Sequence, residues 1–189
     1  NTTELPLVVN DSNLRPTFIA ACDLAMDSLA SYGLYCHVNI VWGQDTVSGM
    51  FSETKANSVL PGAKTRDYTI SMAEWICNRY KDHPAFGYLS IGNEYVTDEA
   101  AITAPTSAQL SEFFTAIVAA VKEISAKILV TADISSPPVN LTRTKPTVEQ
   151  TIDKFRALYK GLDFYCLHMY NDDYSFTGHQ SRSEERRVG

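Results

Sequence analysis

The hydrophobic pattern switches between two periods along the chain. Segments whose apolar residues recur every three or four positions predict helices, and the shorter apolar or alternating segments between them predict strands. Four helices are predicted, over 15–32, 67–80, 106–125 and from 147 onward. Four strands are predicted, over 34–42, 88–91, 128–133 and 162–170. This regular alternation indicates βα units and a parallel sheet.

Local signals support three of the helices. In the first, four apolar residues at spacings of three, four and three predict one buried face: Ile19, Cys22, Met26 and Leu29. The third and fourth begin with capping-box patterns, Thr106 with Gln109 and Thr147 with Gln150. The predicted buried stripe of the fourth helix is Ile152, Phe155 and Tyr159.

The connections that follow strands are longer than those that follow helices. Residues 43–66 and 134–146 are predicted to be loops, because they show no periodic pattern. Loops of this length are uncommon and usually functional. Long strand-to-helix loops are typical of a (β/α)8 TIM barrel, whose active site they build. Such a barrel typically needs about 250 residues, so four βα units in 189 residues correspond to about half a barrel.

The two ends of the sequence suggest a fragment. The chain begins with Asn1, and its last eight residues, 182–189, are charged and carry no apolar periodicity. We interpret 182–189 as a non-native tail, the translation of a sequencing-library adapter, and 1–181 as a partial barrel domain. The alternative is a charged natural tail.

The amino-acid composition limits the classes of binding partner that the protein is expected to have. The formal net charge of −6 argues against nucleic acid or an anionic membrane as a partner. No apolar run approaches the roughly 20 residues that span a bilayer. The sequence shows no metal-binding motif and no cofactor motif. The four cysteines are widely spaced, which favours buried free thiols over a zinc site: Cys22, Cys36, Cys77 and Cys166.

The most informative motif is the segment from His83 to Tyr95. Its centre, 88–91, is a short predicted strand, and Gly92, Asn93 and Glu94 follow directly. A carboxylate at the end of an apolar strand is costly unless it has a partner or a function. In a parallel barrel, this end of the strand is where the active site lies.

This segment resembles the fourth-strand motif of the clan A glycoside hydrolases, which are retaining (β/α)8 enzymes. The resemblance implies that Glu94 is the general acid/base and that Asn93 binds the sugar 2-hydroxyl. It also implies that the chain holds approximately strands three to six, with the nucleophile on a strand outside it. The alternatives are a Glu94 that caps a helix or pairs with an arginine, and an Asn93 that stabilises the strand end.

The last predicted strand ends in His168-Met169-Tyr170, which resembles the sixth-strand motif of the same clan. The resemblance implies that His168 and Tyr170 bind substrate. Two further strand residues have open roles. Trp42 is either a sugar-stacking residue or a packing residue, and Asp133 is either a ligand contact or a cap. His37 and Asn39 are expected to be structural.

The resemblance therefore predicts a retaining β-glycosidase that acts on β-linked poly- or oligosaccharides. It implies a carbohydrate substrate and no cofactor, and it favours a secreted or periplasmic location. The alternative is a non-catalytic carbohydrate-binding barrel that lacks the second carboxylate. Another class of barrel enzyme, such as an aldolase, would need a strand-end lysine or a metal-binding acidic cluster, and neither occurs in the sequence.

Overall fold

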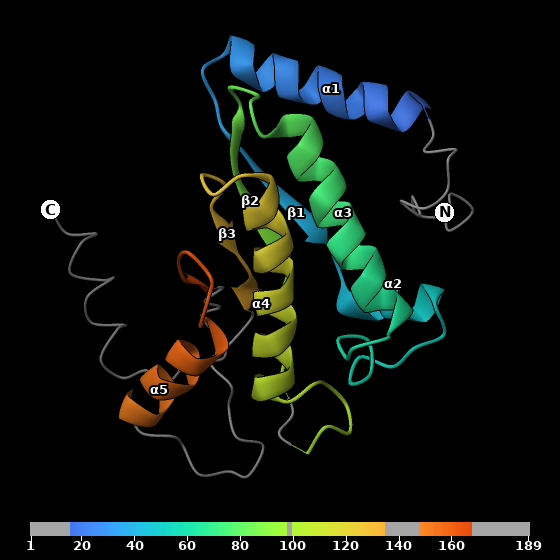
Figure 1. Ribbon diagram of the computed structural model, residues 1–189, viewed down its shortest axis with the longest axis vertical. Coiled ribbons are helices and arrows are strands. Elements are labelled where there is room, and N and C mark those ends of the chain that lie inside the picture. Colours follow the sequence, from blue (N-terminus) through green and yellow to red (C-terminus); the bar gives the residue numbers. More distant parts are fainter. Residues whose placement is uncertain (1–15, 98–99, 135–147, 168–189) are drawn as a thin grey trace, which may run out of the picture.

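The structure, a computed structural model, describes residues 16–97, 100–134 and 148–167. Helices and strands alternate along these residues (Figure 1), as the sequence predicts. The helices are α1 (Pro16–Ser31), α2 (Gln44–Met50), α3 (Lys64–Tyr80), α4 (Ser107–Ile124) and α5 (Val148–Leu158). The strands are β1 (Cys36–Val41), β2 (Phe86–Gly92), β3 (Val130–Thr131), β4 (Asp133–Ile134) and β5 (Cys166–Leu167).

The strands pair in parallel, which confirms the predicted α/β class. One sheet has the order β1-β2-β3, with Asn39 opposite Ser90 and Ser90 opposite Thr131. A second sheet pairs β4 with β5, with Asp133 opposite Cys166. A single residue separates β3 from β4, so the predicted strand 128–133 is present but shorter and interrupted.

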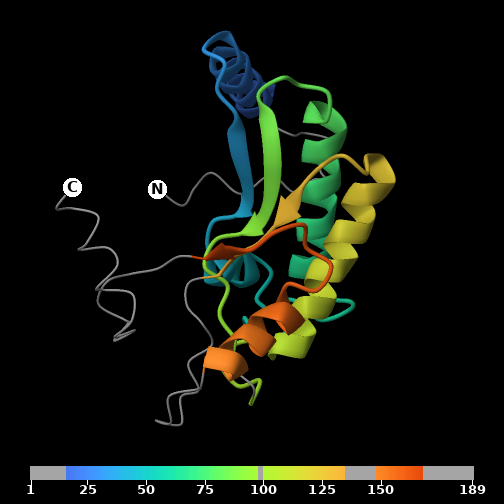
Figure 2. The same ribbon diagram turned by 90° about the vertical axis from the view of Figure 1, so that its left-hand side faces the viewer.

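Helices α3 and α4 cover one face of the β1-β2-β3 sheet (Figure 2). The core lies between these layers, where Leu89 and Ile91 of β2 are fully buried with Phe113 and Phe114 of α4. Side chains alternate along a strand, and the residues on either side of Ser90 belong to this core. Ser90 therefore faces the opposite side of the sheet.

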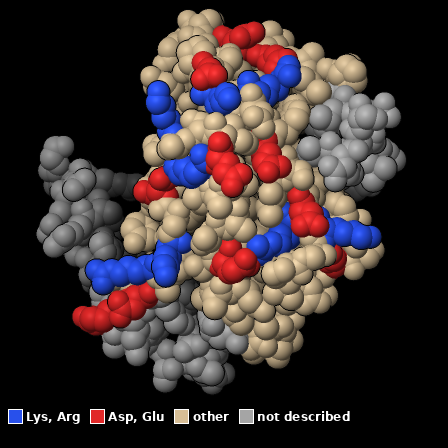
Figure 3. Space-filling model, in the orientation of Figure 1, with Lys and Arg blue, Asp and Glu red and all other residues tan. Residues whose placement is uncertain are grey.

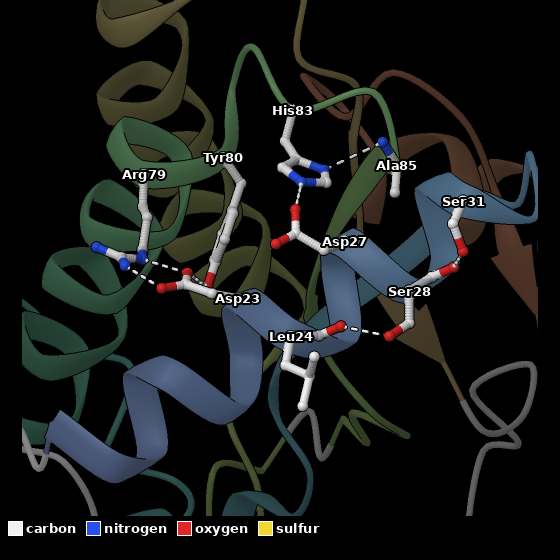
Figure 4. A network of polar contacts seen from close by, with 9 residues as sticks. All are labelled: Asp23, Leu24, Asp27, Ser28, Ser31, Arg79, Tyr80, His83 and Ala85. Atoms are coloured by element: carbon white, nitrogen blue, oxygen red, sulfur yellow. Dashed lines mark hydrogen bonds and ion pairs between the residues drawn. The ribbon is translucent and has the colours of Figure 1, made fainter.

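Helix α1 is attached to α3 and to the start of β2 by polar contacts (Figure 4). Asp23 accepts hydrogen bonds from Arg79 Nε at 2.8 Å and from the Tyr80 hydroxyl at 2.9 Å. Hydrogen bonding by Arg79 holds the pKa of Asp23 below its ordinary value. His83 Nδ1 accepts from the Ala85 N–H, and His83 Nε2 lies 3.1 Å from Asp27 Oδ1. The histidine of the motif therefore connects α1 to β2, at the end of the strand away from Glu94.

The predicted buried face of α1 is confirmed only in part. Met26 is buried, and Cys22 and Leu29 are partly buried against the core from the same helix. Ile19 is partly buried and does not belong to this core cluster. Thr106 Oγ1 accepts from the Gln109 N–H at 3.2 Å, and Gln109 Oε1 accepts from the Thr106 N–H at 2.9 Å. The predicted capping box of α4 is therefore confirmed. The capping residue Thr147 lies outside the described residues.

The prediction that 43–66 is an unstructured loop is wrong. The segment contains α2, and it is followed by turns that lead into α3. Glu53 accepts hydrogen bonds from the Lys64 and Thr65 N–H groups at 2.8 and 3.0 Å, so it caps α3 from eleven residues upstream. This cap accounts for a start at Lys64 instead of the predicted 67, because it satisfies the first amide groups of the helix.

The predicted stripe of α5 is wrong at Ile152, which is 42% exposed. The helix is anchored near its C-terminal end, where Ala157 O accepts from Ser111 Oγ of α4 and Leu158 is fully buried. Tyr159, just past the helix, is also buried. Ile152 lies in the first half of the helix, away from this contact.

Charged residues of both signs are interspersed on the helix-covered side of the molecule (Figure 3). Several form ion pairs between elements, including Arg66 with Glu112 at 2.6 Å and Lys122 with Asp163 at 2.7 Å. The view shows no large patch of one sign. The four cysteines are free thiols, of which Cys77 is buried and the other three are partly buried.

Candidate active site

The ends of β1 and β2 and the start of β4 meet around the Asn93-Glu94 segment. The Asn93 N–H donates to the Val41 carbonyl at the end of β1, at 2.7 Å. The Tyr95 N–H donates to the Asp133 carbonyl at the start of β4, at 3.0 Å. Glu94 therefore lies between two backbone hydrogen bonds that fix it to both neighbouring strands.

The backbone of Glu94 is left-handed, with φ at +53°. A non-glycine residue in this region costs of order 1–3 kcal/mol, and such residues cluster at functional sites. Glu94 is half-buried. The capping box at the start of α4 is formed by Thr106 and Gln109.

A polar cluster lies on the side of the sheet opposite α3 and α4. Asn39 Nδ2 of β1 donates to Asp133 Oδ2 of β4 at 3.1 Å and lies 3.5 Å from Ser90 Oγ of β2. His37 Nε2 is 3.7 Å from the same Asp133 oxygen. Asp133 is only 2% exposed, so these partners supply the polar contacts that a buried carboxylate requires.

Two acceptors of the polar cluster have no hydrogen-bond donor among the described residues. They are Asn39 Oδ1 and Asp133 Oδ1, and both atoms are buried. An unsatisfied buried acceptor is costly, typically about 1–3 kcal/mol. Burial, followed by the neighbouring Asp133 carboxylate, raises the pKa of the Cys166 thiol to about 12. The Cys166 thiol at the margin of the cluster is therefore neutral at physiological pH.

Aromatic side chains extend this region. The Tyr88 ring stacks on the His37 ring, with centroids 4.5 Å apart, and meets the Phe164 ring edge-on at 5.0 Å. Trp42 follows β1 and is 81% exposed. This exposure argues against a packing role for Trp42 and leaves an aromatic face accessible beside the ends of the strands.

The structure places Trp42, Asn93, Glu94 and Asp133 at the same end of the parallel strands, as the sequence predicts. His168 and Tyr170 lie outside the described residues. Sequence reasoning treated His37 and Asn39 as structural residues, and Asp133 is their shared partner. His37 and Asn39 are two residues apart on β1, which indicates from the sequence that they share a face. Only the strand register shows that Asp133 lies beside these two residues.

Over residues 16–97, 100–134 and 148–167, no three His, Cys, Asp or Glu side chains are grouped so that they can hold a metal ion. No helix in these ranges is long and apolar enough to cross a membrane.

Comparison with solved structures identifies the class of fold. The chain is similar to the endo-1,4-beta-mannanase from Rhizomucor miehei, with a TM-score of 0.60 and 17% sequence identity over 88% of this chain. A second structure, described as a glycoside hydrolase, has a TM-score of 0.47 and 13% identity over 62% of the chain and 35% of its own. No family model and no curated protein matches the sequence.

The fold is therefore similar to that of a glycoside hydrolase. The chain spans about half of the mannanase, 54% of its length. At this level of identity the similarity concerns the fold, and the chemistry must be argued from the residues of this chain.

Proposed function

We propose that this chain is part of a retaining β-glycosidase that hydrolyses β-linked polysaccharide, with Glu94 as the general acid/base. The observation that carries the proposal is the fixed position of Glu94 at the carboxyl end of β2, between the end of β1 and the start of β4. The mannanase-like fold supports it and makes β-1,4-mannan the first substrate to test. In this proposal the chain is a partial (β/α)8 barrel that holds approximately strands three to six.

Each proposed role is the one that the resemblance to the clan A glycoside hydrolases implies, and the chemistry of each side chain is compatible with it. Glu94 protonates the departing glycosidic oxygen and then, as a carboxylate, deprotonates the attacking water. Asn93 binds the sugar 2-hydroxyl, and His168 and Tyr170 contact the same sugar. A retaining mechanism also needs a nucleophilic carboxylate about 5–5.5 Å from the acid/base. We propose that this carboxylate comes from the strand that follows Tyr170 in a longer chain.

The test uses such a longer chain and the Glu94→Ala variant. An aryl glycoside with a good leaving group needs no protonation, so the variant still forms the covalent intermediate. Turnover of β-mannan, whose leaving group is poor, should fall by about 10²–10⁴-fold. Azide should restore the rate on the aryl glycoside, because it replaces the base-activated water.

Glu112→Gln is the matched control, since Glu112 is a carboxylate on the outer surface of α4 with a side chain 54% exposed. It should leave both substrates unaffected. Equal losses on both substrates in Glu94→Ala without azide rescue would reject Glu94 as the acid/base. A parent chain that binds mannan without hydrolysing it would instead support the non-catalytic barrel.

A further inference from the structure

The residues on either side of Asn93-Glu94 fit together closely. Gly92 ends β2, and a Cβ atom at this position would lie 2.4 Å from Cε2 of the Tyr95 ring. Non-bonded carbon atoms normally approach to about 3.5–4.0 Å. Any side chain at position 92 would therefore displace the Tyr95 ring or the backbone between the two residues.

The Tyr95 ring is itself fixed by the core. It is 2% exposed and lies against two rings of α4, Phe114 at 5.3 Å and Phe113 at 6.3 Å between centroids. Burial raises the pKa of the Tyr95 phenol, so the side chain stays neutral. Because the Tyr95 N–H also bonds to the Asp133 carbonyl, both its side chain and its backbone are held.

Glu94 is the residue left with an unfavourable backbone conformation. It lies between Asn93, which is bonded to the end of β1, and Tyr95, which is fixed in the core. A left-handed φ at a glutamate persists only where the surroundings impose it. The contact between Gly92 and the Tyr95 ring supplies that constraint within three residues of chain.

We propose that Tyr95, whose ring packs against Gly92, is the positioning residue that holds Glu94 in its catalytic orientation. The inference rests on the proposed function for the catalytic role of Glu94, but the anchoring is testable without it. Loss of the ring should allow 93–95 to relax out of the left-handed turn. Loss of the Tyr95 ring should therefore slow proton transfer by Glu94, and it should lower substrate affinity only weakly.

The anchoring is tested on the 189-residue chain by amide hydrogen exchange, measured by NMR. The observable is the exchange rate at positions 93 and 95 relative to Leu89, whose N–H bonds to Leu129 O within the sheet. In Tyr95→Ala and in Gly92→Ala this ratio should rise about tenfold or more, because the turn opens separately from the sheet.

Two controls separate this effect from a general loss of stability. Val121→Ala removes a fully buried side chain from α4, two turns beyond Phe114, and should lower stability without changing the ratio. Tyr95→Phe keeps the ring and should retain the ratio of the parent chain. An unchanged ratio in both Tyr95→Ala and Gly92→Ala would overturn the proposal.

The catalytic consequence is tested in the longer, active chain. Tyr95→Ala should lower kcat on β-mannan more than on an aryl glycoside with a good leaving group, with KM nearly unchanged. Val121→Ala should change kcat by the same factor on both substrates. Equal loss on both substrates in Tyr95→Ala would limit Tyr95 to a structural role. A parent chain without hydrolase activity would refute the proposed function, while the exchange ratio would still decide the anchoring.

Discussion

The two faces of the β1-β2-β3 sheet differ in chemistry. Toward α3 and α4, Leu89, Ile91 and Val130 are fully buried in an apolar core. On the opposite face, a hydrogen bond joins Asn39 to Asp133, and one acceptor of each side chain has no donor among the residues that the structure describes. One face is a hydrophobic core, whereas the other is a set of polar groups whose hydrogen bonding is incomplete within the described residues.

This difference shows that the two faces of each strand have different roles. A parallel strand buried between two apolar layers reads as a nearly continuous hydrophobic run. β2 instead alternates, with Ser90 between Leu89 and Ile91, so that only one of its faces contributes to the apolar core. The stability of the fold should therefore depend mainly on the helix-covered face.

The largest loss of stability is predicted for a substitution in the apolar face. Leu89→Ala should destabilise the chain by about 2–5 kcal/mol, because it removes a fully buried side chain and leaves a cavity. Ser90→Ala, one residue away on the polar face, should cost only about 0.5–1.5 kcal/mol. Urea unfolding of both variants measures the difference. Similar costs at the two positions would contradict the assignment of separate roles to the faces.

The second prediction concerns the centre of the polar face. Asp133→Ala removes the acceptor for Asn39 Nδ2 and should cost about 1–3 kcal/mol, the penalty of a buried donor left without a partner. Asp133→Asn keeps an acceptor of the same shape and is the matched control, with an expected smaller loss. If both variants were as stable as the parent chain, the polar cluster would contribute nothing to the fold.

The sequence predicts the elements with strong local signals and misses those that depend on tertiary contacts. The capping box of α4 is complete within four residues, so Thr106 and Gln109 were sufficient to place it. The start of α3 depends on Glu53, a distant cap that no local pattern reveals. Helix α2 has only seven residues, too few for a clear apolar periodicity.

The residues of the candidate site also divide into those with a local sequence signal and those that depend on tertiary contacts. Glu94 and Asn93 were identified because their motif is contiguous, and the strand pattern before them gives the correct end of the sheet. The cluster around Asp133 combines three strands, so it depends on the register between β1, β2 and the β3–β4 segment. The left-handed backbone of Glu94 could not be predicted, since it results from the packing of Tyr95 on Gly92 and on α4.

A smaller effect is predicted on the outside of the helix layer, at the ion pair between Arg66 and Glu112. Hydrogen bonding by Arg66 lowers the pKa of Glu112 below its ordinary value. The stabilisation is therefore present at neutral pH and lost as the pH falls through the lowered pKa. Because Glu112 is 54% exposed and screened, Glu112→Gln should cost only about 0.2–1 kcal/mol at pH 7. The difference from the parent chain, measured by urea unfolding, should shrink as the pH is lowered through this pKa.

The smallest effect on stability is expected at Trp42, which belongs to neither buried face. At 81% exposure its ring contributes little to the core, so Trp42→Ala should change stability by no more than about 0.5 kcal/mol. If the ring stacks on sugar at the ends of the strands, the same variant in the longer chain should raise KM for β-mannan several-fold. An aryl monosaccharide too short to reach Trp42 should show no change. Trp42→Phe, which keeps an aromatic face, should recover much of the loss. A large fall in stability without a change in KM would return Trp42 to the packing role that its exposure argues against.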